Sequence, residues 1–323
     1  MISVLIPVYN VDQYLQSCID SLVAQTFKDI EFIFVNDAST DNSLEILEMN
    51  QEKYPDLIRI IDSKEHINLG GARNKGLKAA RGEYVGFVDS DDMIAPNMYE
   101  ELFNTITKNV ADVAFVMYSY IDNKTDYQNA LSKDLHTPGI VWNERLLKME
   151  GRLLNDSDRN DLHIFPIGGI WSGLWKKEVI VDNDVWWIKP KYEDNYWVGL
   201  IYCYISKVSF VQKVCYFYRY NPDSITHKRN QKYTLDRIIV EKSLLNEAKK
   251  RKLYDRFYLS WEYIYIRRYA INTFYMLINN WDIIPYEVLF DISADLNKEF
   301  PLWFQNKYFE DEFRLIKKIF YIA

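Results

Sequence analysis

The stretch YVGFVDSDD, residues 84–92, joins a short apolar run to a cluster of acidic side chains. The run 84–88 has the composition of a strand that is buried in a sheet. Asp89, Asp91 and Asp92 follow it at once, and three carboxylates within four residues repel one another unless a cation lies between them. Hard divalent cations take oxygen ligands, and Mg²⁺ is usually held by one or two carboxylates while substrate phosphates complete its shell. The stretch therefore indicates a strand that ends at a divalent-cation site.

The residues around this stretch alternate between strand and helix patterns. Apolar runs predict strands at 3–7, 30–35, 57–61, 84–88 and 112–118. Helical spacing, and Pro96 at a helix start, predict helices at 13–25, around 44–47, at 71–80 and from 96 to 107. Such alternation is typical of an α/β fold whose parallel sheet is covered on both faces, with ligands at the carboxyl ends of the strands. Asp37 follows the strand 30–35 and has the alternative of simply starting a turn.

The rest of the chain is organised differently. Residues 121–163 are polar and show no regular pattern, and five tryptophans lie between Trp171 and Trp197. After residue 230 the spacing predicts helices at 235–250, 259–277 and 309–321. We therefore divide the chain into an α/β domain at 1–230 and a C-terminal helical subdomain at 231–323.

Composition and charge exclude several classes of protein. The 323 residues are 48% hydrophobic and 26% charged, which excludes a disordered chain. The net charge of −7 argues against nucleic acid as a partner bound by bulk electrostatics. The three cysteines are odd in number and lack CxxC spacing, which argues against a disulfide framework or a zinc site and for a reducing compartment. Aromatic residues reach 16%, an excess that composition alone does not explain.

The N-terminal run MISVLIPVYN has no basic segment before it and no small-residue cleavage site after it. It therefore reads as a strand, not as a signal peptide. No stretch approaches the ~20 apolar residues that span a bilayer. We expect a cytoplasmic protein, and the aromatic tail leaves open a peripheral contact with the inner face of the cell membrane.

Four motifs, in order, are SVLIPVYN (3–10), VNDASTDNS (35–43), GGARNKG (70–76) and YVGFVDSDD (84–92). Together they resemble the N-terminal half of glycosyltransferase family 2, whose members are inverting, nucleotide-sugar-dependent enzymes of the GT-A fold. The likeness continues less tightly through IWSGLWKKEVI (170–180), YEDNYW (192–197) and YRYNPDSITH (218–227). The resemblance implies a GT-A domain, a Rossmann-like and mostly parallel sheet with helices on both faces. Residues 1–120 would be its nucleotide-sugar half and residues 121–230 its acceptor half.

The resemblance also implies roles for single residues in binding the donor. Asp37 would accept the N3–H of a uracil ring, and Tyr9 would offer an aromatic face to the base. Asp91 would coordinate Mn²⁺ or Mg²⁺ that bridges the diphosphate. The implied nucleotide-sugar site consists of Pro7, Val8, Tyr9, Asn10, Asp37, Gly71, Arg73, Asp89 and Ser90. The implied metal site consists of Asp91, Asp89 and His227.

On the acceptor side the family likeness indicates the acidic pair Glu193-Asp194, with Asp194 as the base that takes the proton of the acceptor hydroxyl. The alternative is that the pair merely caps a helix beginning at Asn195. Trp171 would contact the acceptor. Two departures from the family pattern weaken analogy: His66 and Asn68 precede the ARN motif where Asn-x-Gly is usual, and Trp171 is followed by Ser-Gly instead of Asn-Lys.

These features favour transfer from a UDP-sugar to a hydroxyl of a glycan or lipid-linked glycan, as in capsule, exopolysaccharide, lipopolysaccharide or glycoprotein assembly. A polyprenyl-phosphate glycosyltransferase would use the same donor half. A nucleotidyltransferase would want a Gly-rich basic loop near the N-terminus, which PVYNVDQYL lacks. A binding module that has lost catalysis is a third alternative, and the presence of both Asp91 and Asp194 argues against it.

The tail after residue 230 is rich in aromatic residues, with basic residues at 249–252 and 267–268. Aromatics at helical spacing most often form a core, so we expect them to pack on one another, on the catalytic domain or in a homodimer. The alternative is an amphipathic surface that meets a membrane carrying a lipid-linked acceptor.

Overall fold

The structure of the protein is a computed structural model of the full chain. It describes residues 1–132, 139, 142–165, 167–220, 230–282, 284–306 and 308. Two expectations fall outside this range: the role of His227 and the helix at 309–321.

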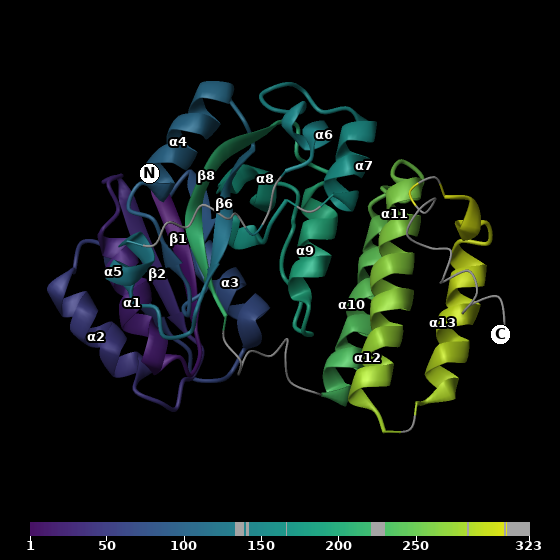
Figure 1. Ribbon diagram of the computed structural model, residues 1–323, viewed down its shortest axis with the longest axis horizontal. Coiled ribbons are helices and arrows are strands. Elements are labelled where there is room, and N and C mark those ends of the chain that lie inside the picture. Colours follow the sequence, from purple (N-terminus) through teal and green to yellow (C-terminus); the bar gives the residue numbers. More distant parts are fainter. Residues whose placement is uncertain are drawn as a thin grey trace.

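An eight-stranded sheet with the order β3-β2-β1-β4-β7-β6-β8-β5 forms the core of the N-terminal part of the molecule (Figure 1). The strands are β1 (Ile2–Val8), β2 (Ile30–Asn36), β3 (Ile58–Asp62), β4 (Tyr84–Phe87), β5 (Met93–Ile94), β6 (Val113–Ile121), β7 (Gly173–Lys176) and β8 (Val208–Arg219). The first four strands are parallel to one another, as the alternating pattern predicts. The sheet is not parallel throughout, because β7 is antiparallel to both β4 and β6 and β5 is antiparallel to β8.

Helices cover both faces of the sheet, which confirms the predicted α/β fold class. The larger ones are α1 (Asp12–Val23), α2 (Ser43–Lys53), α3 (Asn68–Ala79), α4 (Met98–Asn109), α7 (Asp156–Ile164) and α9 (Glu193–Ile201). The shorter ones are α5 (Tyr127–Ser132), α6 (Glu144–Leu147), α8 (Lys177–Val181) and the 3₁₀ turn η1 (Ile170–Ser172). The helices expected between residues 13 and 107 are all present. The three with predicted bounds have ends shifted by up to three residues, and α2 contains residues 44–47.

The C-terminal part is helical and lies on one side of the sheet domain, next to α7 and α9 (Figure 1). It contains α10 (Gln231–Lys250), α11 (Tyr258–Ile264), the π-helical segment η2 (Tyr265–Asn272), α12 (Thr273–Asn280), α13 (Tyr286–Glu299) and the 3₁₀ turn η3 (Trp303–Gln305). The single helix expected at 259–277 is the continuous run of α11, η2 and α12. Helix α13 was not expected from the sequence. All described strands precede residue 220, and the division near residue 230 stays a prediction.

Alternation along β1 explains how one strand serves two cores. Leu5 packs with Val85 and Phe87 under α3, whereas Val4 and Ile6 pack on the opposite face with the residues of α1. Successive side chains of a strand point to opposite faces, so β1, which is covered on both, is buried at every position.

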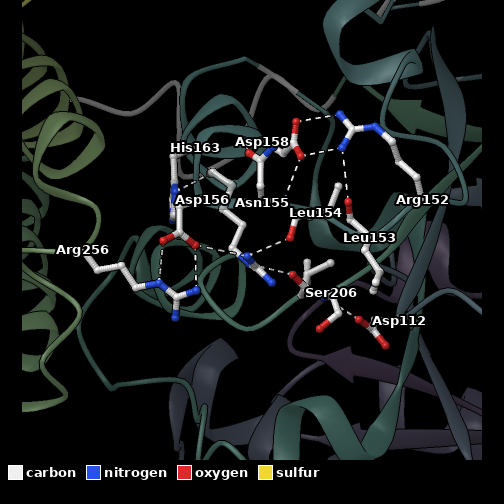
Figure 2. Close-up of polar contacts among 12 residues, drawn as sticks. Asp112, Arg152, Leu153, Leu154, Asn155, Asp156, Asp158, His163, Ser206 and Arg256 are labelled. Atoms are coloured by element: carbon white, nitrogen blue, oxygen red, sulfur yellow. Dashed lines mark hydrogen bonds and ion pairs between the residues drawn. The ribbon is translucent and has the colours of Figure 1, made fainter.

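Two ion pairs tie α7 into the molecule, and Figure 2 shows them side by side. Arg152 binds both oxygens of Asp158 at 2.6 and 2.7 Å, and Asn155 closes a capping box with Asp158 at the start of α7. Arg256, between α10 and α11, binds both oxygens of Asp156 at 2.9 and 2.7 Å. The capping box fixes where α7 begins, and the Arg256 pair joins that end to the helical part.

Most of the aromatic side chains that the structure describes lie in the hydrophobic core or pack against it. Trp175 and Trp197 are 1% and 0% exposed and meet edge to face at 4.9 Å, and Trp187 is also buried. In the helical part Trp261 and Tyr269 are buried, whereas other aromatics of α12 and α13 stay exposed. The tryptophans between 171 and 197 therefore form mainly core, not a site lining, and the packing interpretation of the tail holds for its buried aromatics.

Two smaller expectations can be compared with the structure. Cys18, Cys203 and Cys215 are buried free thiols, so no disulfide joins them. Among the described helices, none combines the length and apolar composition that crossing a membrane requires.

We expect Trp175→Ala to lower the free energy of unfolding by about 3–5 kcal/mol, because it leaves a cavity where Phe115 and Trp197 now pack. Urea denaturation followed by circular dichroism measures this change. Leu153→Ala is the matched control, since Leu153 is 71% exposed, and it should change stability by less than about 0.5 kcal/mol. Equal effects of the two substitutions would contradict the assignment of Trp175 to the core.

Candidate active site

Parallel pairing brings the ends of β1, β2 and β4 to one edge of the sheet. Val8 pairs with Asn36, and the amide of Asp37 donates to the carbonyl of Val8 at 2.8 Å. On the other side of β1, the amide of Val88 donates to Leu5 at 3.2 Å, so Asp89 comes next at the same edge. The fold therefore places the loops after β1, β2 and β4 together, as ligand sites in open α/β sheets require.

Arg73 is the centre of the polar cluster at this edge. Its side chain is 1% exposed, and its guanidinium contacts Asp89 at 3.0 Å, Glu193 at 3.2 Å and Asp194 at 2.6 Å. Arg73 lies on α3, Asp89 follows β4, and the acidic pair lies on α9. One buried cation thus joins three segments that the sequence places far apart.

The charges in this cluster do not balance, and the pKa values show it. Burial, together with the neighbouring Asp194, raises the pKa of Glu193 to about 7 against the opposing effect of Arg73. Burial also raises the pKa of Asp89 to about 6, with Asp91 and Asp194 adding to the shift. Burial alone would lower the pKa of Arg73, but the three carboxylates raise it, so the guanidinium stays charged. The site therefore carries an excess of negative charge that a further positive charge can neutralise.

Helix α9 presents its two carboxylates differently. The helix begins at Glu193, not at Asn195, so both acids lie in its first turn, where the positive end of the helix dipole favours negative charge. The side chain of Glu193 is 7% exposed and that of Asp194 39%. Arg73 and the indole of Trp187 both donate to Oδ1 of Asp194, and no described residue donates to its Oδ2. Asp194 is therefore the carboxylate that can accept a proton from a bound molecule.

A close approach of α3 to the segment before α9 makes this arrangement possible. A Cβ on Gly70 would lie 2.6 Å from the carbonyl oxygen of Ile188 and 3.1 Å from the Glu193 side chain. Asn74, one turn along α3, exchanges two hydrogen bonds with the backbone of Trp187 at 2.8 and 3.0 Å. Glycine at position 70 lets the two segments touch, and Asn74 fixes their register.

Strand β8 holds the acidic loop after β4. The hydroxyl of Tyr216 donates to Asp92 Oδ2 at 2.6 Å, and the amide of Arg219 donates to Asp92 Oδ1 at 2.7 Å. The Arg219 guanidinium donates to the backbone oxygen of Asp91 at 2.7 Å. Asp92 is thus a buried structural anchor, and burial with the charge of Asp91 and Asp89 raises its pKa. Asp91 is half-buried between these anchors.

The loops after β1 and β2 meet at His66. The rings of Tyr9 and His66 lie 4.3 Å apart, and His66 Nδ1 lies 2.9 Å from Asp37 Oδ2. The other oxygen of Asp37 accepts the amide of Ile67 at 2.6 Å. Asn10 Oδ1 accepts the amide of Thr40 at 2.7 Å, which ties the two loops together. Asp37 and Tyr9 are therefore brought together, with His66 between them.

The remaining sequence-derived residues occupy varied positions. Pro7 and Val8 are buried in β1, so that within PVYN only Tyr9 and Asn10 are exposed. Ser90 is buried in the acidic loop, and Gly71 lies in the first turns of α3. Trp171 stacks on Tyr216 at 4.2 Å, which links it to Asp92 rather than to the acidic pair of α9.

Several functional positions escaped sequence reasoning. Tyr216 and Arg219 lie on β8, whose apolar pattern predicts a strand but no site. The predicted site includes Gly71 but not its neighbour Gly70. Trp187 was noted only as one of several tryptophans. No single-sequence signal identifies Tyr216. For Arg219 a signal exists, because a charged residue at the end of an apolar strand indicates a candidate site residue.

Comparison with known proteins agrees with this geometry. The family model described as glycosyl transferase family 2 matches residues 3–168. The chain therefore belongs to glycosyl transferase family 2 and is a glycosyltransferase.

Among its relatives, the glycosyltransferase YibD of Escherichia coli is 30% identical over 271 residues, covering 80% of this chain and 75% of YibD. Among solved structures, S. aureus TarS 1–349 in complex with UDP-GlcNAc has a TM-score of 0.65 at 21% identity, over 92% of this chain and 81% of that one. Mannosyltransferase PcManGT from Pyrobaculum calidifontis, in complex with GDP-Man and Mn²⁺, has a TM-score of 0.51 at 16% identity, over 93% and 81%. At these identities the two structures confirm the GT-A fold.

The raised pKa of Glu193 predicts a pH-dependent stability. The unfolded chain releases this proton near pH 4.5, whereas the folded chain holds it to about pH 7. The stabilisation is therefore complete below pH 4.5 and lost as the pH rises through about 7. Across this window the free energy of unfolding of the wild type should fall by on the order of 2 kcal/mol, and Glu193→Gln should abolish this fall.

Urea denaturation in EDTA at a series of pH values tests this. Glu178→Gln is the matched control, since the side chain of Glu178 is 66% exposed. Asp89 also has a raised pKa, so in both variants the free energy of unfolding keeps a smaller decrease with rising pH. Identical pH profiles for Glu193→Gln and the wild type would show that Glu193 is not held protonated.

Proposed function

We propose that this glycosyltransferase transfers a sugar from a UDP-sugar to a hydroxyl of a glycan acceptor, with inversion at the anomeric carbon and with a divalent metal. The observation that supports this most strongly is the cluster of Asp89, Glu193 and Asp194 around buried Arg73. It joins the loop that would face the diphosphate to the helix that would face the acceptor.

The donor end of the proposal rests on Tyr9 and Asp37. Tyr9 is 47% exposed and offers a ring face at the carboxyl end of β1. Asp37 is buried with an oriented carboxylate, and a uracil ring presents one N–H donor that such a group can accept. Cytosine lacks that donor, so the arrangement favours uridine nucleotides. TarS, which shares the fold, has been solved with UDP-GlcNAc.

The residues of the acidic loop fit a divalent cation. Among the described residues, no group of three His, Cys, Asp or Glu side chains is arranged to hold a metal by itself. The pair Asp89 and Asp91 offers hard oxygen ligands in excess negative charge, and Mg²⁺ or Mn²⁺ needs only one or two carboxylates when phosphates complete its shell. When bound there, the metal would neutralise charge on the departing diphosphate.

The protein's own residues would perform the rest of the transfer. Asp194 Oδ2 takes the proton from the acceptor hydroxyl as that oxygen attacks the anomeric carbon. The bond from that carbon to the diphosphate oxygen breaks on the opposite face, which inverts the configuration. Arg73 and Trp187 hold Oδ1 of Asp194 and so fix the direction of Oδ2. Buried Glu193 has the role of a positioning residue.

We place this transfer at the cytoplasmic side of the cell membrane, in the assembly of a surface glycan. Transfer to polyprenyl phosphate is the second candidate, since it needs the same donor half. The division into residues 1–230 and 231–323 belongs to the same proposal.

Binding of UDP and Mn²⁺ tests the donor site. We expect UDP with Mn²⁺ to raise the melting temperature of the wild type and of Asp194→Ala, but not of Asp91→Ala. With the donor identified from a panel of nucleotide sugars, Asp194→Ala should lower kcat by about 10²–10⁴.

Glu193→Gln is the matched variant for the base, because it alters the neighbouring carboxylate and leaves Asp194 in place. Its kcat should fall by less than that of Asp194→Ala. Full transferase activity in Asp194→Ala would overturn the base assignment, and unchanged UDP–Mn²⁺ stabilisation in Asp91→Ala would overturn the metal site.

A further inference from the structure

A cavity of about 280 Å³ lies behind the catalytic helix, between the end of α7, helix α9 and the π-helical segment η2. Its walls are partly apolar, with Ile164, Val198 and Ile264 among the contributors. Its polar lining includes Arg267, Arg268 and His163. No Asp or Glu is found among the residues described around it. The cavity therefore combines a basic end with an apolar wall.

Arg268 has few partners for a largely buried guanidinium. Within the described part of the chain, its side chain makes one hydrogen bond, from Nη1 to the backbone oxygen of Asn195 at 3.2 Å. Glu241 is a favourable charge near it, but Arg237 and Arg267 act against it, and burial lowers the pKa of Arg268. A guanidinium has five N–H donors, so Arg268 keeps donors for a bound anion.

Both ring nitrogens of His163 lie close to carbonyl oxygens, although burial favours the neutral ring. Its Nδ1 lies 2.9 Å from the carbonyl oxygen of Arg159 and its Nε2 lies 2.9 Å from that of Gly199 (Figure 2 labels His163 on α7). A neutral imidazole donates only one N–H, whereas the imidazolium donates two. Burial lowers the pKa of His163 to about 4. An anion in the cavity would favour the form that satisfies both carbonyls.

We infer that this cavity binds the phosphate group of a phosphorylated organic acceptor, with Arg268 and Arg267 on the phosphate and the apolar wall on the organic part. Planar guanidinium groups suit phosphate oxygens, and the absence of lining carboxylates removes competing repulsion. The assignment to the acceptor rests on the proposed glycosyl transfer. Binding of the anion itself does not.

The position of Arg268 connects the cavity to the catalytic helix. The carbonyl that it binds belongs to Asn195, the residue after Asp194. Arg237 stacks over Tyr192 at 4.0 Å, directly before Glu193. Arg268 thus contacts the first turn of α9, and Arg237 contacts the residue before it. An acceptor phosphate seated here would lie against the same helix that carries the proposed base.

Isothermal titration with glycerol phosphate and with decyl phosphate tests the inference. The titrations contain EDTA, so that a metal-dependent phosphate site does not contribute. We expect wild-type protein to bind at least one probe at millimolar or lower concentration. Arg268→Gln should weaken binding about tenfold or more, because hydrogen bonds to charged groups are strong, and Arg267→Gln should weaken it several-fold.

Arg256→Gln is the matched control, because Arg256 is engaged with Asp156 outside the cavity, and it should leave binding unchanged. Decyl phosphate binding tenfold tighter than glycerol phosphate would identify a lipid-linked phosphate, and similar affinities would identify a phosphate within a glycan or polyol. No binding of either probe, or equal binding in Arg267→Gln and the wild type, would overturn the inference. Exposed Arg267 keeps the test valid if Arg268→Gln does not fold.

UDP binding with Mn²⁺ separates this inference from the proposed function. A protein that binds UDP with metal but neither organic phosphate keeps its proposed activity and loses the cavity assignment. A protein that binds the phosphates in EDTA but does not bind UDP with metal keeps the cavity assignment and loses its proposed activity.

Discussion

The buried guanidinium of Arg73 is the constraint on which the active-site edge depends. A charge that is 1% exposed is tolerable only when it is paired, and Arg73 pairs with carboxylates from β4 and α9. The pairing fixes the distance between the loop proposed to meet the diphosphate and the helix proposed to meet the acceptor. Burial, together with the excess of negative charge that this pairing leaves, raises the pKa values of Asp89 and Glu193. The same pairing therefore supports the structure and leaves the negative charge on which the proposed cation site rests.

The parallel half of the sheet was predictable because its strands are mainly apolar runs that are separated by helices of regular spacing. The other half was not. Strand β7 has four residues, GLWK, and only its pairing with β4 and β6 gives it a direction. Strand β7 is therefore decided by tertiary contacts, which a local pattern does not contain. Helix α13 differs, because Val288, Ile292 and Leu296 have helical spacing and could have predicted it.

The site divides in the same way. The acidic residues after β4, and Asp37 after β2, were found because strand ends are recognisable and carboxylates there have a chemical meaning. The partners that orient them were not. Tyr216 donates a hydrogen bond to Asp92 from a strand 124 residues later, and no sequence pattern near residue 216 predicts this contact. His66 was noted only as a departure from a family pattern, whereas the structure places it against both Tyr9 and Asp37. The identity of such residues is local, but their function comes from distant contacts.

The separation of the partners along the chain has a consequence for folding. The bond between Arg73 and Asp194 closes a loop of 121 residues, and that between Asn74 and Trp187 one of 113. Contacts of such long range are slow to form, because the entropy of loop closure is lost before they stabilise the chain. The parallel strands β1, β2 and β4 can pair much earlier. During synthesis, the emerging chain would therefore carry a nearly complete sheet edge in which Arg73 has Asp89 but not the two carboxylates of α9, until α9 has left the ribosome.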